Sequence, residues 1–177
     1  PKSLLRNKLC VSSLKAMGPG TTFHRVMHDV VPLCPDESVA RVIICSGKVY
    51  YDLLQERAKR KIKNIFFLRL EQLYPFPKEA LLNELARFPE AEVVWCQEEP
   101  ENMGAWTFVD RKLEEVLVEL GGRSLRAGYI GRPEAASPAT GSLGTHNAEQ
   151  ALILDQAMSD VEQGPKKNVS SERQAAE

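Results

Sequence analysis

Two adjacent carboxylates that follow an apolar run carry the strongest chemical signal in this chain. The apolar run Val93–Trp95 is followed by Glu98, Glu99 and Pro100, and an amphipathic segment then starts at Trp106. Paired carboxylates can act as general acid and base. Adjacent residues of an extended segment point to opposite sides, however, so these two cannot readily share one proton. We expect one of them to contact a helix N-terminus or a cation across an interface, and a solvated loop is the alternative. The interface candidates are Glu98, Glu99, Asn102, Trp106 and His146.

A second candidate site combines a short glycine turn with two cations. Ser46, Gly47 and Lys48 lie between a predicted strand and a predicted helix, where free N–H groups attract anions. The motif is too short for a Walker loop, and a tight turn capped by Ser46 is the alternative. Arg132 is expected at the rim of the last strand, where it could bind a phosphate or carboxylate or form an internal ion pair. We therefore take Ser46, Gly47, Lys48 and Arg132 as candidates for binding an anionic effector.

The remaining polar residues give no catalytic or metal-binding pattern. His146 follows Thr145, which is the expected cap of the last helix, so this histidine is interpreted as structural. His24 and His28 lie four residues apart, but no third ligand is apparent. There is no G-x-S-x-G elbow and no Ser/His/Asp order. We predict no catalytic residue and no metal site.

Composition bounds the class of protein. The 177 residues are 43% hydrophobic with a net charge of −1, which favours one globular domain and gives no case for binding nucleic acid or an anionic membrane. No apolar stretch approaches the roughly 18 residues that span a bilayer. The chain starts at Pro1 without a signal peptide, which suggests a fragment or a processed piece. Cys45 and Cys96 lie in apolar runs, so reduced cysteines are expected, in the bacterial cytoplasm or the mitochondrial matrix.

The pattern of apolar residues predicts an α/β domain whose mostly parallel sheet is flanked by helices on both faces. Strands are expected at 40–45, 65–70, 91–97 and 125–130, and helices at 49–61, 78–88, 106–120 and 146–158. Pro77 suits a first helical position, and Gly121 suits the end of a helix. The third helix should turn Phe108, Val109, Leu113, Val116 and Leu117 inward. Residues 1–38 form an irregular lead-in with a short strand within 23–31, residues 39–158 form the domain, and residues 159–177 form a disordered tail.

Several sequence blocks, in this order, resemble one family. They are PKSLLR at 1–6, CSGKVYYDL at 45–53, RLEQLYPFP at 69–77, WCQEEP at 95–100, NMGAW at 102–106, and GRP at 131–133 with SPATG at 137–141. Together they resemble the C-terminal region of the decarboxylating subunit of 2-oxoglutarate dehydrogenase, over roughly residues 1 to 158.

The resemblance implies a transketolase C-terminal-domain-like fold and a parent oxidoreductase of the tricarboxylic acid cycle. Such a parent uses thiamine diphosphate and magnesium, held by its other domains at a homodimer interface. It passes a succinyl group to a lipoyl arm within a multienzyme complex that includes a dihydrolipoyl succinyltransferase. This chain lacks the family's G-D-G…N signature for magnesium and diphosphate, so it is not expected to bind the cofactors or to catalyse the reaction alone.

The role that follows is structural and regulatory. We expect the domain to support the dimer and to close one side of the active-site region with the sheet edge at 98–106. The resemblance also implies a nucleotide or acyl-CoA effector, such as AMP or acetyl-CoA. Alternatives are a parent that acts on 2-oxoadipate, a stand-alone interaction module, and a small enzyme that uses Glu98 or His146.

Overall fold

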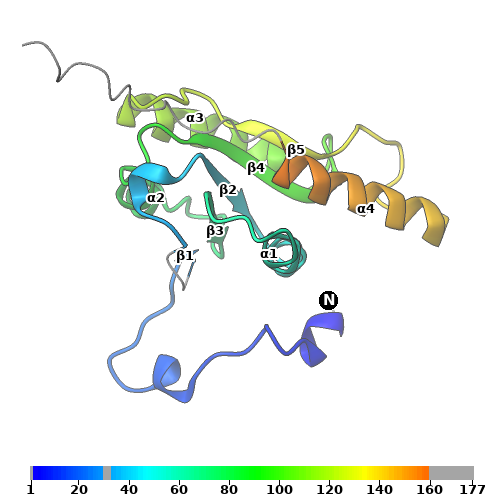
Figure 1. Ribbon diagram of the computed structural model, residues 1–177, viewed down its shortest axis with the longest axis horizontal. Coiled ribbons are helices and arrows are strands. Elements are labelled where there is room, and N and C mark those ends of the chain that lie inside the picture. The colour runs from blue at the N-terminus through cyan, green and yellow to red at the C-terminus, as the bar shows by residue number, and fades with distance from the viewer. Residues whose placement is uncertain (1, 30–32, 160–177) are drawn as a thin grey trace, which may run out of the picture.

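The computed structural model describes residues 2–29 and 33–159, which form a five-stranded sheet and four α-helices (Figure 1). The strands are β1 (Val26–His28), β2 (Arg41–Cys45), β3 (Ile65–Leu70), β4 (Glu92–Pro100) and β5 (Gly128–Arg132). The helices are α1 (Val49–Arg60), α2 (Lys78–Leu85), α3 (Trp106–Leu120) and α4 (Leu143–Met158). The strand order is β1-β3-β2-β4-β5, and only β1 runs antiparallel to its neighbour. The predicted fold class, α/β with a mostly parallel sheet, is confirmed.

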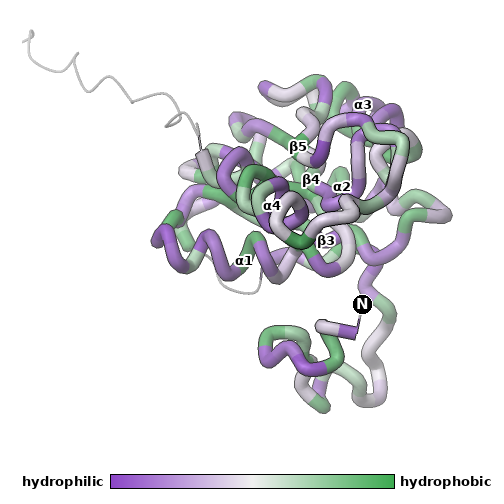
Figure 2. The backbone as a smooth tube through the Cα atoms, turned by 90° about the vertical axis from the view of Figure 1, so that its right-hand side faces the viewer, coloured by the Kyte–Doolittle hydropathy of each residue, from purple (hydrophilic) through white to green (hydrophobic). Residues whose placement is uncertain are grey.

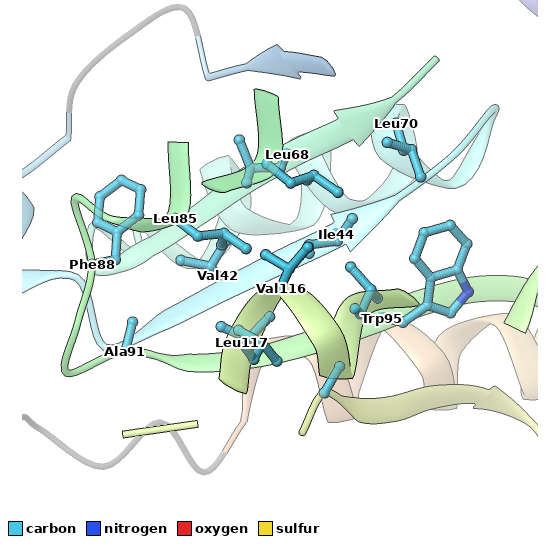
Figure 3. Close-up of a cluster of buried hydrophobic side chains, with 14 of the residues drawn as sticks. Val42, Ile44, Leu68, Leu70, Leu85, Phe88, Ala91, Trp95, Val116 and Leu117 are labelled. Atoms are coloured by element: carbon cyan, nitrogen blue, oxygen red, sulfur yellow. The ribbon is translucent and has the colours of Figure 1, made fainter. Parts of the chain in front are cut away.

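Helices cover both faces of the sheet because alternate residues of each buried strand point to opposite sides. One core packs the strands against α2 and α3, and Figure 3 shows Val42, Trp95 and Val116 within it. The other core packs Ile43 and Phe67 of the strands against α1 and α4. The sheet therefore sits between two apolar layers.

The sheet has a topological switch point between β2 and β4, because the chain continues outward from these two neighbouring strands in opposite directions. Helix α1 leads from β2 to β3 on one side, whereas α3 leads from β4 to β5 on the other. Ligands of open α/β sheets bind at the carboxyl ends of the strands where such a switch occurs. Cys45 and Cys96 are register partners there, so the turn that starts at Ser46 leaves the sheet beside the last part of β4.

The starts of the helices differ from the sequence expectation. Helix α1 begins at Val49 and its N-cap position is Lys48, so Ser46 does not cap it. Helix α4 begins three residues earlier than predicted, because the Ser142 hydroxyl accepts a hydrogen bond from the Thr145 N–H and Thr145 lies inside the helix.

Other boundaries also shift. Pro77 occupies the N-cap position of α2 rather than its first turn. Helix α3 ends as predicted, with Gly121 in the left-handed conformation. Phe108 was expected inward and is 40% exposed, because successive helical residues rotate by about 100° and Phe108 lies away from the stripe of Trp106 and Leu113. Strand β5 starts at Gly128, and Leu125 lies exposed before it.

The lead-in contains β1, which lies in the predicted interval 23–31, and three short 3-10 helices. The predicted division of the chain at residue 39 stays a prediction. The predicted disordered tail, apart from Ser159, lies outside the described residues.

Candidate functional site at the carboxyl edge of the sheet

Lys48 forms the centre of a charged cluster where β2 and β4 end. Its ammonium group contacts the Asp52 carboxylate one helical turn later and lies 2.9 Å from an oxygen of Glu98. Gly47 makes the preceding turn possible with a left-handed φ of 75°. Burial alone would lower the pKa of Lys48, but the hydrogen bonds to Asp52 and Glu98 raise it above its ordinary value. Lys48 is therefore a fixed cation.

Arg132 approaches the same point from the end of β5. Its Nε lies 2.7 Å from the Glu149 carboxylate on α4, and one terminal nitrogen donates to the Glu98 carbonyl. The other terminal nitrogen lies 3.2 Å from Nδ1 of His146. Gln150 completes the link, since its side chain contacts Arg132 at 3.4 Å and donates to Asp52 at 3.1 Å.

These contacts form one set of side chains, which we call the edge network. Its members are Lys48, Asp52, Glu98, Arg132, His146, Glu149 and Gln150. Two cations face three carboxylates, so both cations are already paired within the cluster, which keeps one surplus negative charge. Partly buried ion pairs of this kind hold elements in one arrangement. The edge network therefore ties α1 and α4 to the ends of β4 and β5.

A second polar centre lies on the opposite face of β4, around Gln97. The buried amide oxygen accepts hydrogen bonds from the Trp95 indole at 2.9 Å and from the Trp106 N–H at 3.0 Å. The amide nitrogen donates to the carbonyls of Glu99, Pro100 and Met103. One side chain thus fixes the whole turn from β4 into α3.

Four of the five predicted interface residues belong to these two centres, and Asn102 lies outside both. Glu98 and His146 belong to the edge network, whereas Trp106 is buried at the start of α3, with its ring 5.2 Å from that of Tyr129. Asn102 exchanges two hydrogen bonds with the backbone of Ala135 and so holds the loop before α4. Glu99 is exposed on the Gln97 side. The two carboxylates therefore point apart, as predicted.

The anion-binding candidates also come together only in part. Lys48 and Arg132 both contact Glu98, so the structure brings these cations to one point. Ser46 and Gly47 form the adjacent turn. Sequence reasoning weighed an internal ion pair for Arg132, and the ion pair with Glu149 is what the structure contains.

Sequence reasoning missed four residues of these centres. Asp52 could have been found from its position four residues after Lys48 on a helix, where opposite charges meet. Gln97 could have been found as a polar residue at a buried position of a strand. Glu149 and Gln150 had no signal, because their role depends on how α4 lies against the sheet.

Within residues 2–29 and 33–159, no group of three His, Cys, Asp or Glu side chains is placed to hold a metal ion. Each carboxylate of the edge network already pairs with one of its cations, and the sequence contains no Walker loop. These residues therefore do not fit thiamine diphosphate and magnesium, and we derive no catalytic step from them. Over the same residues, no helix is long and apolar enough to cross a membrane.

Comparison with known proteins shows the family of this chain. The family described as 2-oxoglutarate dehydrogenase C-terminal matches residues 11–158. Proteins named 2-oxoglutarate dehydrogenase E1 component from Brucella anthropi, Brucella ovis and Brucella canis are 51% identical over 166 residues. The match covers 89% of this chain but only 16–17% of those relatives, so the chain spans about one-sixth of their length. The chain belongs to the 2-oxoglutarate dehydrogenase C-terminal family.

Proposed function

We propose that this chain works as the C-terminal part of a 2-oxoglutarate dehydrogenase E1 component. The observation that carries the proposal is the identity of 51% over almost the whole chain to proteins with that name. The parent would decarboxylate 2-oxoglutarate oxidatively with thiamine diphosphate and magnesium bound by its other domains, since the part of this chain that the structure describes offers no group of side chains for the metal ion. Four free cysteines support a reducing compartment, either the bacterial cytoplasm or the mitochondrial matrix.

Turnover assays test this proposal. The longer polypeptide that contains this chain should consume 2-oxoglutarate when thiamine diphosphate, magnesium and a lipoyl acceptor are supplied, and the 177-residue chain should not. Preference for 2-oxoadipate by the longer polypeptide would point to the related dehydrogenase instead. Robust turnover by the 177 residues alone would contradict the assignment of catalysis to other domains.

The role of the domain in the parent is to present a rigid sheet edge to its neighbours. Glu99 supports this role, because it is exposed near the end of β4, where Gln97 holds the backbone with several hydrogen bonds. The neighbours we propose are the remaining domains, a second subunit, and the dihydrolipoyl succinyltransferase of the complex. Rigid, exposed groups suit docking because little order is lost on binding.

Charge reversal at Glu99 tests the docking role. Glu99→Lys in the longer polypeptide should weaken the homodimer or its binding to the succinyltransferase, measured by sedimentation. Glu90→Lys is the matched control, since Glu90 is exposed at the opposite end of β4. Equal behaviour of the two variants would remove Glu99 from the interface.

An anionic effector is the regulatory part of the proposal. Lys48 and Arg132 meet at Glu98, and a nucleotide or acyl-CoA phosphate would have to displace carboxylates from them. Calorimetric titration of AMP and acetyl-CoA into the longer polypeptide measures this. Lys48→Ala should lower the affinity at least ten-fold, whereas exposed Lys63→Ala should not. An unchanged affinity would rule out Lys48 as an effector contact.

A further inference from the structure

The N-terminal lead-in leaves an unusual amount of apolar surface uncovered. We call residues 2–25 the arm. In Figures 1 and 2 the arm hangs away from the sheet and turns back toward α1. Its large apolar side chains are exposed, and Leu14 is 85% exposed. The exposed members are Leu5, Leu9, Val11, Leu14, Met17 and Phe23.

The arm is nevertheless held in place at both ends. Strand β1 directly follows it and pairs with β3, and the Arg25 carbonyl accepts hydrogen bonds from the N–H groups of Glu71 and Gln72. At the other end, Leu4 and Cys10 pack against the core under α1. The exposed side chains therefore belong to a fixed surface and not to a loose terminus.

The arm and the domain line a half-open cavity of about 420 Å³. Leu9 and Val11 line it from the arm, and Met27, Tyr50 and Tyr51 line it from the domain. Apolar surface of this kind, lying next to polar residues, marks interaction sites in proteins. The cavity and the arm thus form one continuous, mostly apolar surface.

The charge of the arm indicates the chemistry of its partner. Residues 1–28 contain five Lys or Arg and no Asp or Glu, while the whole chain has a net charge of −1. None of these five cations forms an ion pair with any part of the chain that the structure describes. A partner that is apolar with acidic residues around it would complement this surface.

We propose that the arm and the cavity beneath it form the docking surface for an apolar, acidic segment of the parent polypeptide that lies outside these 177 residues. The proposal rests on the proposed function, because the relatives contain about five-sixths of their length beyond the match. The family match starts at residue 11, so most of the exposed apolar residues of the arm lie within it.

Hydrogen–deuterium exchange tests the docking surface. Amides of residues 9–17 should exchange at least ten-fold slower in the longer polypeptide than in the 177-residue chain. The double variant Leu14→Asp/Met17→Asp should restore fast exchange in the longer polypeptide. Val118→Asp is the control, because Val118 is 58% exposed on α3 and lies outside the arm. In the Val118→Asp variant, the amides of the arm should stay protected from exchange.

Three results would overturn the proposal. The first is equal exchange of the arm in both proteins. The second is protection in the isolated chain that rises with concentration together with a dimer mass by light scattering, which assigns the surface to a second copy. The third is protection that appears only with phosphatidylserine vesicles, which assigns it to a membrane.

The outcome can be separated from that of the proposed function. If the longer polypeptide turns over 2-oxoglutarate but the amides of its arm are not protected from exchange, only the docking proposal is contradicted. Protection of the arm in a polypeptide that does not act on 2-oxoglutarate would sink the proposed function and leave the docking surface standing.

Discussion

At the scale of single residues, Gln97 decides the geometry of the turn from β4 into α3. Its amide satisfies three backbone carbonyls, one backbone N–H and the indole of Trp95. Buried polar groups that lose their partner cost about 1–3 kcal/mol each. A side chain that satisfies so many of them has no simple substitute, and this makes Gln97 a positioning residue for Glu99 and Trp106.

Gln97→Met keeps the length of the side chain and removes every one of these hydrogen bonds. We expect the free energy of unfolding to fall by about 2–4 kcal/mol, measured by urea denaturation. Gln55→Met is the matched control, because Gln55 is exposed on α1. It should change stability by less than about 0.5 kcal/mol. Similar effects of the two substitutions would contradict the role of Gln97.

The raised pKa of Lys48 predicts how the free energy of unfolding changes with pH. Its pKa is raised in the folded protein above the ordinary 10.5, since Asp52 and Glu98 outweigh burial. The stability that this provides is complete below pH 10.5 and is lost as the pH rises through the folded pKa. The difference in unfolding free energy between wild type and Lys48→Met should therefore shrink above pH 10.5. A difference that grows there would show that the sign is wrong.

At the scale of elements, the turn between β4 and α3 is restricted to one conformation by the backbone of Gly104 and by its close neighbours. Gly104 adopts a φ of 67°, and a Cβ at this position would lie 3.0 Å from both Gln97 Nε2 and the Glu99 Cβ. Gly121 adopts a similar φ of 64° at the end of α3, but nothing lies within 4 Å of its Cβ position. Comparing substitutions at the two positions therefore separates the effect of backbone strain from the effect of steric crowding.

Substitution of each glycine by alanine measures the two effects. Gly121→Ala should cost about 1 kcal/mol, which is the price of a left-handed alanine. Gly104→Ala should cost about 3 kcal/mol, because crowding against Gln97 and Glu99 is added. Thermal and urea unfolding check the values. Equal costs would mean that the turn can relax around a methyl group.

At the scale of the whole molecule, buried arginines connect the layers. The Arg57 guanidinium forms two hydrogen bonds to Asp29, at 2.6 and 2.8 Å, and so joins α1 to the residue after β1. Arg41 donates to the carbonyls of Gln156, Ala157 and Ser159 and so fixes the end of α4. These contacts join elements that are far apart in the sequence, which favours unfolding of the domain as one unit.

Buried thiols report on that cooperativity. Burial raises the pKa of Cys96, with help from Glu98, to about 12, and burial raises the pKa of Cys45 well above its ordinary value. Both thiols should resist iodoacetamide at pH 8 until the domain unfolds, whereas partly exposed Cys10 should react at once. Labelling followed by mass spectrometry across a urea series checks this. Reaction of Cys96 before the unfolding transition would reveal local opening of β4.

The fold could be predicted from the sequence because local patterns of apolar and polar residues indicate where strands and helices lie. The runs that became β2 and β3 are rich in β-branched and aromatic residues, and their ends shifted by one residue at most. Helix starts were less predictable, as at Ser142, because a hydroxyl caps a helix only where the backbone allows it. The expectation that Phe108 points inward was wrong, because the apolar character of a residue does not by itself show which side of its helix faces the core.

Local periodicity and residue identity were enough to predict the class of fold, the mostly parallel sheet and the family. Only the tertiary structure decided that Lys48 and Arg132 share Glu98 while Glu149 neutralises Arg132. It alone revealed that Gln97 organises a turn and that the arm leaves Leu14 uncovered. The reason is that pairing and exposure depend on distances between groups that lie up to 118 residues apart in the sequence, as for Arg41 and Ser159, and no local pattern encodes those distances.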